Sequence, residues 1–414
     1  MRLLQITKKF PFPLHDGESI AVTNLSKSLC AQGWEVDLLA MNTSKHPFES
    51  NERPAALSHY GKVQFSNIDN QVTWKGALLH LMQGKSYQVE RFVDFSFEQR
   101  LGAMLREGRY DVVQLESFYL SPYIETIRRY TNAHVSMRAH NIEHLIWRRL
   151  AEHTDRGLKR WYMKKVYREL ETLETQYLSE YDSLLSISSC DQKKFLELGY
   201  DGPIKNIPIG LDPDHYEQVR QNEVKDIGFI GTLDWRPNEQ GLRWFLDEIW
   251  GDCLNLLGKN RLHIAGRGAS SSLRGKLEST PYCNYHGEVP CSDAFLQQHS
   301  IMIVPLLSGS GMRVKILEGM AKGMLVITTR QGLEGIPAKH QREVLVADSP
   351  KAFVDALRWA IQEPEKVHAM QSAAVEFIER EFHMLDQGEK LDSFYAEILP
   401  AKPQKQRSML TFGN

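Results

Sequence analysis

Two hydrophobic patterns alternate along the first half of the chain. Short apolar runs typical of buried strands are followed by stretches in which apolar residues recur at helical spacing. RLLQIT precedes AVTNLSKSLCAQG, VVQLES precedes PYIETIRRY, and HVSMRAHN precedes IEHLIWRRLAEH. Apolar strands connected through helices build parallel sheets with helices on both faces. The first half is therefore predicted to form a doubly wound α/β sheet.

The same alternation starts again in the second half. DIGFIGTLDW precedes NEQGLRWFLDEIW, RLHIAGRG precedes SSLRGKLEST, and VLVAD precedes PKAFVDALRWAIQ. Between the two series, GPIKNIPIGLDPDHYEQVRQNE (202–223) carries Pro, Gly and polar residues that break both periods, which places a hinge at about 205–220. Two Rossmann-like, doubly wound domains facing a cleft are predicted, and ligands of such sheets lie beyond the carboxyl ends of the strands.

These breaks also define the expected domain boundaries. A first Rossmann-like domain is expected over residues 1–205 and a second over residues 206–375. Terminal helices are expected over 376–400 and are candidates to cross back to the first domain, followed by a mobile tail over 401–414.

Composition narrows the class of protein. The 414 residues include 50 Lys and Arg against 52 Asp and Glu, so no global field draws the chain to nucleic acid, which is not expected as a partner. Five scattered cysteines favour reduced thiols. No apolar run approaches the roughly 20 residues of a membrane span. A cytoplasmic location without a visible export signal is expected.

The segment GSGMRVKILEGMAKG (309–323) carries the strongest chemical pattern. It follows an apolar run, opens with two glycines, and presents two cations at the start of a helix expected to begin near Gly311 or Met312. Unpaired N–H groups, the helix dipole and close backbone approach at glycine favour an anion. Arg313 and Lys315 would add charge, so a phosphate or diphosphate is the ligand that fits.

A simpler interpretation treats the charges of this segment as surface pairs. Lys315, Glu318 and Lys322 are spaced three and four residues apart, and such solvated pairs are common on helices. That interpretation leaves the glycines and Arg313 unexplained. A Walker-type phosphate loop is excluded, because the segment lacks the GxxxxGK[ST] spacing.

The segment SGSGMRVKILEGMAKGMLVITT is similar to the donor-site segment of retaining glycosyltransferases of family four, which have the GT-B fold and use nucleotide-activated sugars. Three further stretches resemble the same family in the same order: FPFPLHDGESIAVTNLSKSLCAQGWEVDLLAMN, RAHNIEHLIW and GFIGTLDWRPNEQGLRWFL. The resemblance covers nearly the whole chain. It implies a donor-binding second domain and an acceptor-side first domain.

The resemblance also implies the reactants. The co-substrate would be a nucleotide-diphosphate sugar, with no further cofactor and no metal, and the acceptor a glycan, a lipid-linked compound or a small molecule. Cell-surface polysaccharide or glycoconjugate synthesis is the expected setting. In this family the acceptor attacks the face from which the diphosphate leaves, and no protein nucleophile is needed.

Residue roles carry over by position. Glu318 matches the glutamate that binds the ribose hydroxyls, whereas the glutamate expected eight positions earlier is replaced by Ser310. Arg313 and Lys315 match the cations of GxGxRxK variants that grip the diphosphate. Val289 matches an apolar contact to the base, with a plain core valine as the alternative. The remaining donor-binding candidates are Gly231, Thr232, Asn238, Arg267, Gly309, Gly311 and Met312.

The first domain contributes a second group of candidates. His140 matches the histidine that contacts the sugar near its reacting carbon, and Asn141 follows it on the acceptor side. Asp16 and Gly17 occupy a loop that approaches the donor phosphate or the acceptor, although Gly17 could equally make a plain turn. Arg138 and Glu143 are not assigned catalytic roles, because they could equally pair with each other and brace the loop.

The sequence also bears on three other functions. A nucleotide-sugar epimerase shares the architecture but needs carboxylates for proton transfer, and Ser310 leaves open a non-catalytic nucleotide-sugar binding protein. A dinucleotide oxidoreductase is disfavoured, because no strand is followed by GxGxxG. DPD at 212–214 is interpreted as a turn rather than a metal site, and Cys283, His286 and Cys291 lack the spacing of a zinc site.

The stretch 147–170 combines eight Arg or Lys with three acids and several aromatic residues. A long solvated helix with aromatic core contacts is the favoured interpretation. The alternative is an interfacial helix resting on anionic lipid, which would make the protein a peripheral membrane enzyme.

Overall fold

The computed structural model describes most of the chain. The described residues are 1–14, 16–44, 47–50, 52–70, 86–152, 154, 157–212, 215–216, 226–257, 261–309 and 311–400. Ser310, the tail over 401–414 and parts of the expected hinge lie outside them.

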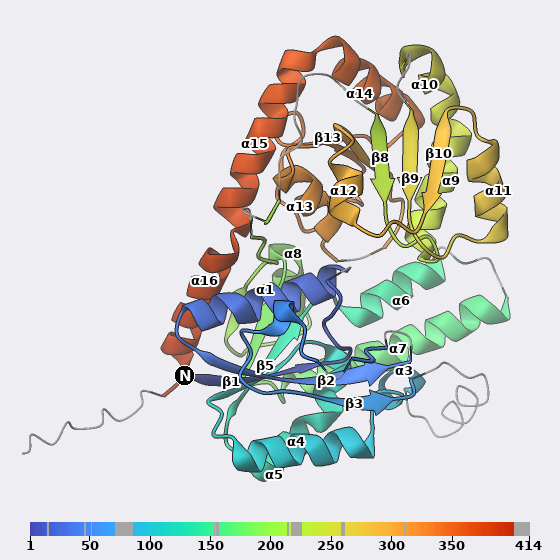
Figure 1. The fold of residues 1–414 in the computed structure, drawn as a ribbon. Helices are drawn as coiled ribbons and strands as arrows, with labels where there is room; N and C mark the ends of the chain where they lie inside the picture. Colours follow the sequence, from blue (N-terminus) through green and yellow to red (C-terminus); the bar gives the residue numbers. More distant parts are fainter. Residues whose placement is uncertain are drawn as a thin grey trace, which may run out of the picture.

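The amino-terminal half is built on a seven-stranded parallel sheet in the order β3-β2-β1-β4-β5-β6-β7 (Figure 1). All four residues of VVQL in the fourth strand are buried, as expected where helices cover both faces of a sheet. The predicted doubly wound α/β architecture is confirmed in this half. The strands are β1 (Arg2–Thr7), β2 (Glu35–Thr43), β3 (Val63–Ile68), β4 (Val112–Leu115), β5 (His134–Ala139), β6 (Ser183–Ser186) and β7 (Ile204–Asn206).

Helices connect these strands. They are α1 (Gly17–Ala31), η1 (Ala55–Leu57), α3 (Tyr87–Glu90), α4 (Phe95–Glu107), η2 (Phe118–Tyr123), α5 (Ile124–Tyr130), α6 (Glu143–Glu152), α7 (Leu158–Leu178) and α8 (Ser189–Glu197). The prediction of one long helix over the basic stretch 147–170 is therefore wrong, because the stretch is divided between α6 and α7. Gly157 lies between them at φ +124°, a conformation that a right-handed helix does not admit.

The carboxyl-terminal half repeats the architecture with a six-stranded sheet in the order β10-β9-β8-β11-β12-β13. Its strands are β8 (Ile227–Ile230), β9 (Leu262–Ala265), β10 (Cys283–Gly287), β11 (Ile301–Val304), β12 (Leu325–Thr328) and β13 (Leu345–Val346). Its helices are α9 (Arg236–Glu248), α10 (Trp250–Leu257), α11 (Ser271–Ser279), α12 (Ser292–Leu296), α13 (Val314–Ala321), α14 (Pro350–Gln362) and α15 (Pro364–Phe382), followed by α16 (Met384–Ile398). Every strand pair of this sheet is parallel.

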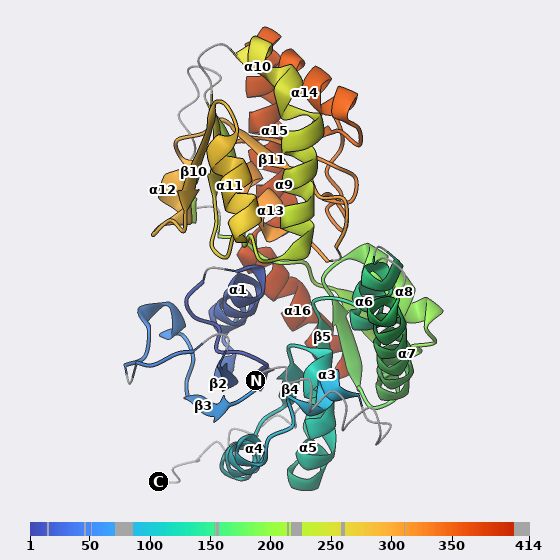
Figure 2. The ribbon, with the colours of Figure 1, turned by 90° about the vertical axis from the view of Figure 1, so that its right-hand side faces the viewer.

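The last two helices connect the halves. In Figures 1 and 2, α15 runs beside the carboxyl-terminal sheet and α16 continues onto the amino-terminal half, next to α1. Trp34 Nε1 donates a hydrogen bond to Asp392 Oδ1 at 2.7 Å, and a side chain at Gly388 would lie 2.6 Å from Ser28 Oγ. The end of the chain thus packs on the half that begins it.

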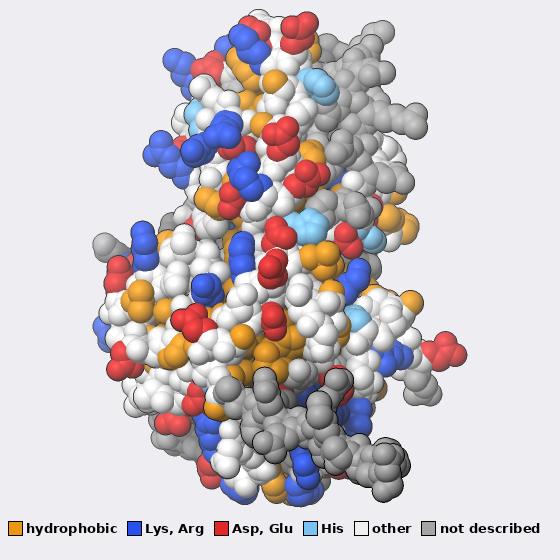
Figure 3. Space-filling view, turned by 90° about the vertical axis from the view of Figure 1, so that its left-hand side faces the viewer, with side chains coloured by type: hydrophobic (Ala, Val, Ile, Leu, Met, Phe, Trp, Pro, Cys, Tyr) orange, Lys and Arg blue, Asp and Glu red, His pale blue; other side chains and the backbone are white. Residues whose placement is uncertain are grey.

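Apolar contacts also join the halves directly. Ile20 and Ile187 of the amino-terminal half share a buried cluster with Met312 and Val314 of the carboxyl-terminal half. On the face in Figure 3, basic and acidic side chains are interspersed, in keeping with the near balance of charge in the sequence. Burial of these apolar residues holds the two sheets with their loops facing one another.

Candidate active site

The loop after β11 and the start of α13 form the centre of the site. Gly309 and Gly311 adopt φ of +110° and +81°, which only glycine accommodates readily. The helix begins at Val314, with Arg313 at its N-cap in an extended conformation. The predicted start near Gly311 or Met312 is therefore wrong by two to three residues, because a residue at positive φ cannot belong to a right-handed helix.

Two glycines allow the halves to approach closely. A Cβ atom at Gly311 would lie 2.1 Å from Asn141 Oδ1, and one at Gly17 would lie 2.4 Å from Val314 Cγ2. Real Cβ atoms do not tolerate such distances, so a side chain at either glycine would displace Asn141 or Val314. Gly17 therefore does more than make a turn, since it sets the first loop of the amino-terminal half against the start of α13.

Arg313 is 94% shielded from solvent, with a relative exposure of 6%. Its Nη1 donates to the Gly311 carbonyl oxygen at 2.6 Å, and its guanidinium lies 5.4 Å from the centre of the Trp235 ring. Burial lowers the pKa of Arg313 to about 10, and Glu334 partly offsets that effect. The guanidinium remains charged at neutral pH and is held in one place before any ligand arrives.

Lys315 lies one residue beyond the start of α13. Its Nζ donates to Asn238 Oδ1 at 2.9 Å and to the Ile230 carbonyl oxygen at 3.3 Å. Burial, and then the neighbouring charge of Arg313, lower the pKa of Lys315 to about 7. No carboxylate is bonded to this ammonium among the described residues, so an anion in the cleft would stabilise its charged form.

Glu318 and Lys322 do not form the solvated surface pair of the simpler interpretation. Lys322 is fully buried, and its Nζ lies 2.7 Å from Asp293 Oδ1. Burial and the charge of Asp293 raise the pKa of Glu318 to about 7. That interpretation is wrong because Lys322 is buried against Asp293 and Tyr216, while Lys315 and Glu318 line the cleft instead of the outer surface.

One cleft of 620 Å³ collects most of the predicted residues. Its walls come from the first loop and α1 of one half and from the β8, β9 and β11 loops of the other, at the carboxyl ends of the strands. The predicted residues that line it are Asp16, Gly17, Gly231, Thr232, Asn238, Arg267, Met312, Arg313, Lys315 and Glu318.

Other predicted residues lie beside this cleft rather than in its wall. Asn141 and Gly309 line a neighbouring cavity, and Gly311 contacts Asn141. Val289 is half-buried and packs against the apolar cluster that contains Val314. It thus takes the position of a core valine at the edge of the site.

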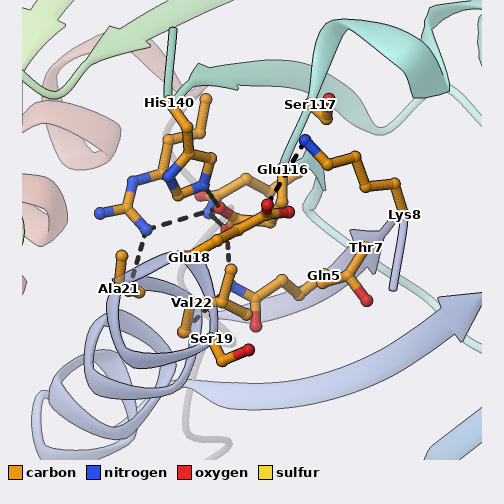
Figure 4. A network of polar contacts seen from close by, with 12 residues as sticks. Gln5, Thr7, Lys8, Glu18, Ser19, Ala21, Val22, Glu116, Ser117 and His140 are labelled. Carbon is orange, nitrogen blue, oxygen red and sulfur yellow. Dashed lines mark hydrogen bonds and ion pairs between the residues drawn. The ribbon is translucent and has the colours of Figure 1, made fainter. Parts of the chain in front are cut away.

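His140 belongs to a buried network under the cleft (Figure 4). Its Nε2 lies 2.8 Å from Glu116 Oε2, and Gln5 donates to Glu116 Oε1. Burial alone would raise the pKa of Glu116, but the Arg138 guanidinium and the bonds from His140 and Gln5 lower it to about 2. The ionised Glu116 thereby fixes the orientation of the imidazole.

The same network corrects one prediction. Arg138 does not pair with Glu143: its Nη1 lies 3.4 Å from Glu116 Oε2 and donates to the Ala21 carbonyl oxygen at 3.0 Å. Glu143 instead accepts a hydrogen bond from Tyr119 at 3.0 Å. The Arg138 side chain extends from β5 to α1, where it reaches Ala21, whereas Glu143 begins the next helix.

Two charged residues that are not among the candidates from the sequence, Lys9 and Glu18, line the amino-terminal wall of the cleft. Lys9 Nζ pairs with Asp16, whose carboxylate also accepts from the Glu18 and Ser19 backbone N–H groups and caps α1. Lys8 pairs with Glu18 at 3.4 Å. The adjacent lysines after β1 were the sequence signal for this wall. Asp16 lines the cleft, but its oxygens are already occupied.

A larger hollow of 780 Å³ lies elsewhere, between residues such as Met1, Asp111 and Leu399. It is at the amino ends of the strands, opposite the edge where open α/β sheets bind ligands. Among the residues that the structure describes, no group of three His, Cys, Asp or Glu is arranged to hold a metal ion, and no helix could cross a bilayer.

Two Rossmann-like sheets facing a cleft, with paired cations at the start of a helix, are the arrangement of the GT-B fold, and family matches assign this chain to the glycosyltransferases. The chain belongs to the group 1 glycosyl transferases. Residues 224–363 match the family described as glycosyl transferases group 1, and residues 16–210 match the glycosyl transferase 4-like domain.

Solved structures and one curated protein are similar over almost the whole chain. Sucrose-phosphate synthase from Thermosynechococcus elongatus superposes with a TM-score of 0.69 at 14% identity, covering 96% of this chain and 99% of that one. HepE from Anabaena, in complex with UDP, gives 0.65 at 12% identity, covering 96% and 100%. An uncharacterised 44.6 kDa protein in the cps region of Klebsiella pneumoniae is 24% identical over 370 residues, covering 85% of this chain and 89% of that protein.

Proposed function

We propose that this glycosyltransferase moves a sugar from a nucleotide-diphosphate donor to an acceptor hydroxyl with retention of anomeric configuration and without a metal. The observation that carries the proposal is the convergence of Arg313, Lys315 and the amino end of α13 on one cleft between the two sheets. These groups form a preorganised seat for a diphosphate. HepE, which has the same fold, was crystallised with UDP and with UDP-glucose, so UDP-glucose is the first donor to test.

Each part of the donor has a place in this arrangement. The diphosphate would contact Arg313 and Lys315, and the ribose hydroxyls would donate to the Glu318 carboxylate, which loses its proton near neutral pH. The sugar would extend toward His140. Donor binding brings negative charge next to both cations, and this favours protonated Lys315.

The reaction then needs only the groups already present. The bond from the anomeric carbon to the phosphate oxygen breaks while the acceptor oxygen bonds to the same face of that carbon, and the acceptor proton passes to the departing phosphate. Negative charge on the leaving diphosphate grows in the transition state. Fixed cations therefore stabilise the transition state more than the bound donor.

Two carboxylates of the cleft, Glu18 and Asp16, are unsuited to the proton transfer of the epimerase alternative. Glu18 has a pKa below its ordinary range: burial would raise it, but Lys8 and Lys9 lower it further. The same balance between burial and Lys9 lowers the pKa of Asp16. Carboxylates with low pKa values are poor acceptors of a carbon-bound proton. Glu318 has a pKa of about 7, which suits such a base, so the assay for an epimerised sugar decides this point.

The cps-region relative supports cell-surface polysaccharide synthesis as the setting.

The proposal is tested with labelled UDP-, GDP- and ADP-sugars in the presence of a metal chelator. We expect thermal stabilisation by one base class and slow release of the nucleoside diphosphate. Arg313→Ala should reduce turnover roughly 10²- to 10³-fold, and Arg313→Lys should restore part of it, because lysine keeps the charge but loses the planar fork. Arg330→Ala is the matched control, since Arg330 is exposed and pairs with Asp348.

The outcomes separate the candidate functions. Release of free sugar or transfer to an acceptor supports the proposal, whereas an epimerised sugar nucleotide supports the isomerase. Binding without turnover supports a nucleotide-sugar binding protein. Equal turnover by the Arg313→Ala variant and the wild type would remove the diphosphate seat from the mechanism.

A further inference from the structure

A second cavity of 310 Å³ lies beside the donor cleft. One wall is α6 of the amino-terminal half, and the other is the start of α9 with the loop after β11. Figure 1 shows α6 directly below the lower end of the carboxyl-terminal half, and Figure 2 shows it below and to one side of that end. Because each half supplies a wall, the cavity is complete only when the two sheets are held together.

A charged clasp closes one side of this cavity. Arg149 of α6 donates to both Glu334 carboxylate oxygens, at 2.7 and 2.6 Å, and Nη1 also donates to the Gly309 carbonyl oxygen at 2.7 Å. Bidentate pairs of this kind fix geometry as well as charge. The clasp ties the loop that carries the donor-site glycines to α6. The Glu334 carboxylate balances the positive charge of Arg149.

The larger part of the cavity lining is apolar. Ile146 and Leu150 contribute from α6, and Trp235 and Pro237 contribute from the start of α9. Trp235 lines the donor cleft as well, so its indole separates the two spaces. Aromatic rings beside aliphatic side chains suit the C–H face of a sugar ring, which is apolar while its edge is polar.

Polar groups complete the lining. Asn141, Arg236, Gln240 and Ser308 border the cavity, and Ser308 donates a hydrogen bond to Gln240 Oε1 at 3.0 Å. Carboxamides and hydroxyls both donate and accept hydrogen bonds, as hydroxyl groups around a pyranose ring require. An apolar lining with a few placed polar groups is typical of sites for small organic ligands, and 310 Å³ is at the lower end of their sizes.

We propose that this cavity binds one pyranose ring of the acceptor, an inference that rests on the proposed function. Asn141 follows His140 directly and touches Gly311, so the cavity borders the position where the donor's sugar would react. A ring held there would direct a hydroxyl past the edge of Trp235. Trp235, Leu150 and Gln240 thereby become determinants of acceptor specificity.

The same chemistry could be offered by the donor's own sugar ring, and the test distinguishes the two sources. Binding of methyl glucoside, methyl galactoside and methyl mannoside is followed by saturation-transfer NMR, alone and with UDP or UDP-glucose. Leu150→Trp fills the cavity, and Gln240→Ala removes one amide. The matched controls are Leu196→Trp on exposed α8 and Gln362→Ala at the exposed end of α14.

We expect at least one methyl glycoside to bind the wild type and both controls in the presence of UDP. Leu150→Trp should weaken that binding roughly tenfold or more, and Gln240→Ala several-fold, while the affinity for UDP and the thermal midpoint stay near those of the wild type. The thermal midpoint shows whether the tryptophan has damaged the fold.

Three results would overturn the inference. They are wild-type binding of no methyl glycoside, unchanged binding by both Leu150→Trp and Gln240→Ala, and displacement of the glycoside by UDP-glucose but not by UDP. The last would give the cavity to the donor's sugar. If the wild type binds a methyl glycoside but none of the nucleotide sugars, the proposed function is contradicted, whereas the assignment of the cavity to a sugar ring is supported.

Discussion

Replacing Lys315 by methionine tests the electrostatic description of the donor site. Methionine keeps most of the length of the lysine side chain and removes its charge. The pKa of Lys315 falls from its usual 10.5 to about 7 in the folded protein. At about 1.4 kcal/mol for each pH unit, this shift corresponds to a folding cost of at most about 5 kcal/mol. The charged, buried Lys315 thus lowers the free energy of unfolding as long as no anion occupies the site.

The sign of the pH dependence follows from where the proton binds. Between pH 7 and 10.5, the unfolded chain holds the Lys315 proton and the folded protein does not. The cost is therefore complete below pH 7, and the free energy of unfolding rises with pH through this window. The variant has no such group, so its stability relative to the wild type should fall by up to about 1.4 kcal/mol per pH unit above pH 7.

Urea unfolding of both proteins from about pH 6 to about pH 9 measures this difference. The lost hydrogen bonds to Asn238 and to the Ile230 carbonyl cost roughly 1 to 2 kcal/mol at every pH, so the slope rather than the offset is diagnostic. The affinity of the wild type for UDP should decline above pH 7, where Lys315 loses its proton. The variant should bind UDP more weakly and should not show this decline. Lys351→Met, at an exposed position of α14, is the control. A difference that does not vary with pH would refute the desolvated lysine.

Four further predictions follow. Gly17→Ala places a Cβ atom 2.4 Å from Val314 Cγ2 and should slow sugar transfer roughly 10²-fold, with partial recovery in a Gly17→Ala/Val314→Ala double variant. Arg149→Ala and Glu334→Ala should each loosen the two halves, seen as a larger radius of gyration by X-ray scattering, and the double variant should be no looser than either. In the wild type the free energy of unfolding should fall as pH rises from 4.5 to 7, because only the folded protein holds the Glu318 proton there. Glu318→Gln should remove this fall, and urea unfolding measures it. If α7 rests on anionic lipid, charge reversal of four cations should abolish liposome co-sedimentation, and unchanged binding would exclude that contact. The four cations are Lys159, Arg160, Lys164 and Lys165.

The sequence determined much of this protein because its signals are local. Apolar runs alternating with helical spacing predicted two doubly wound sheets, since the period of apolar residues is set by the geometry of strand and helix. The order Gly309, Gly311, Arg313 and Lys315 predicted an anion seat, because glycine at positive φ and cations at a helix start act within a few residues. These inferences needed no knowledge of distant neighbours.

The tertiary structure decided which distant groups meet. Only packing shows that Lys315 bonds to Asn238, that Lys322 turns to Asp293, and that Arg138 turns to Glu116. Desolvation depends on every atom around a charge, so the pKa of Lys315 near 7 could not be read from its neighbours in the chain. The cavity between α6 and Trp235 is formed by surfaces of two halves that fold around separate sheets, and their relative placement exists only in three dimensions.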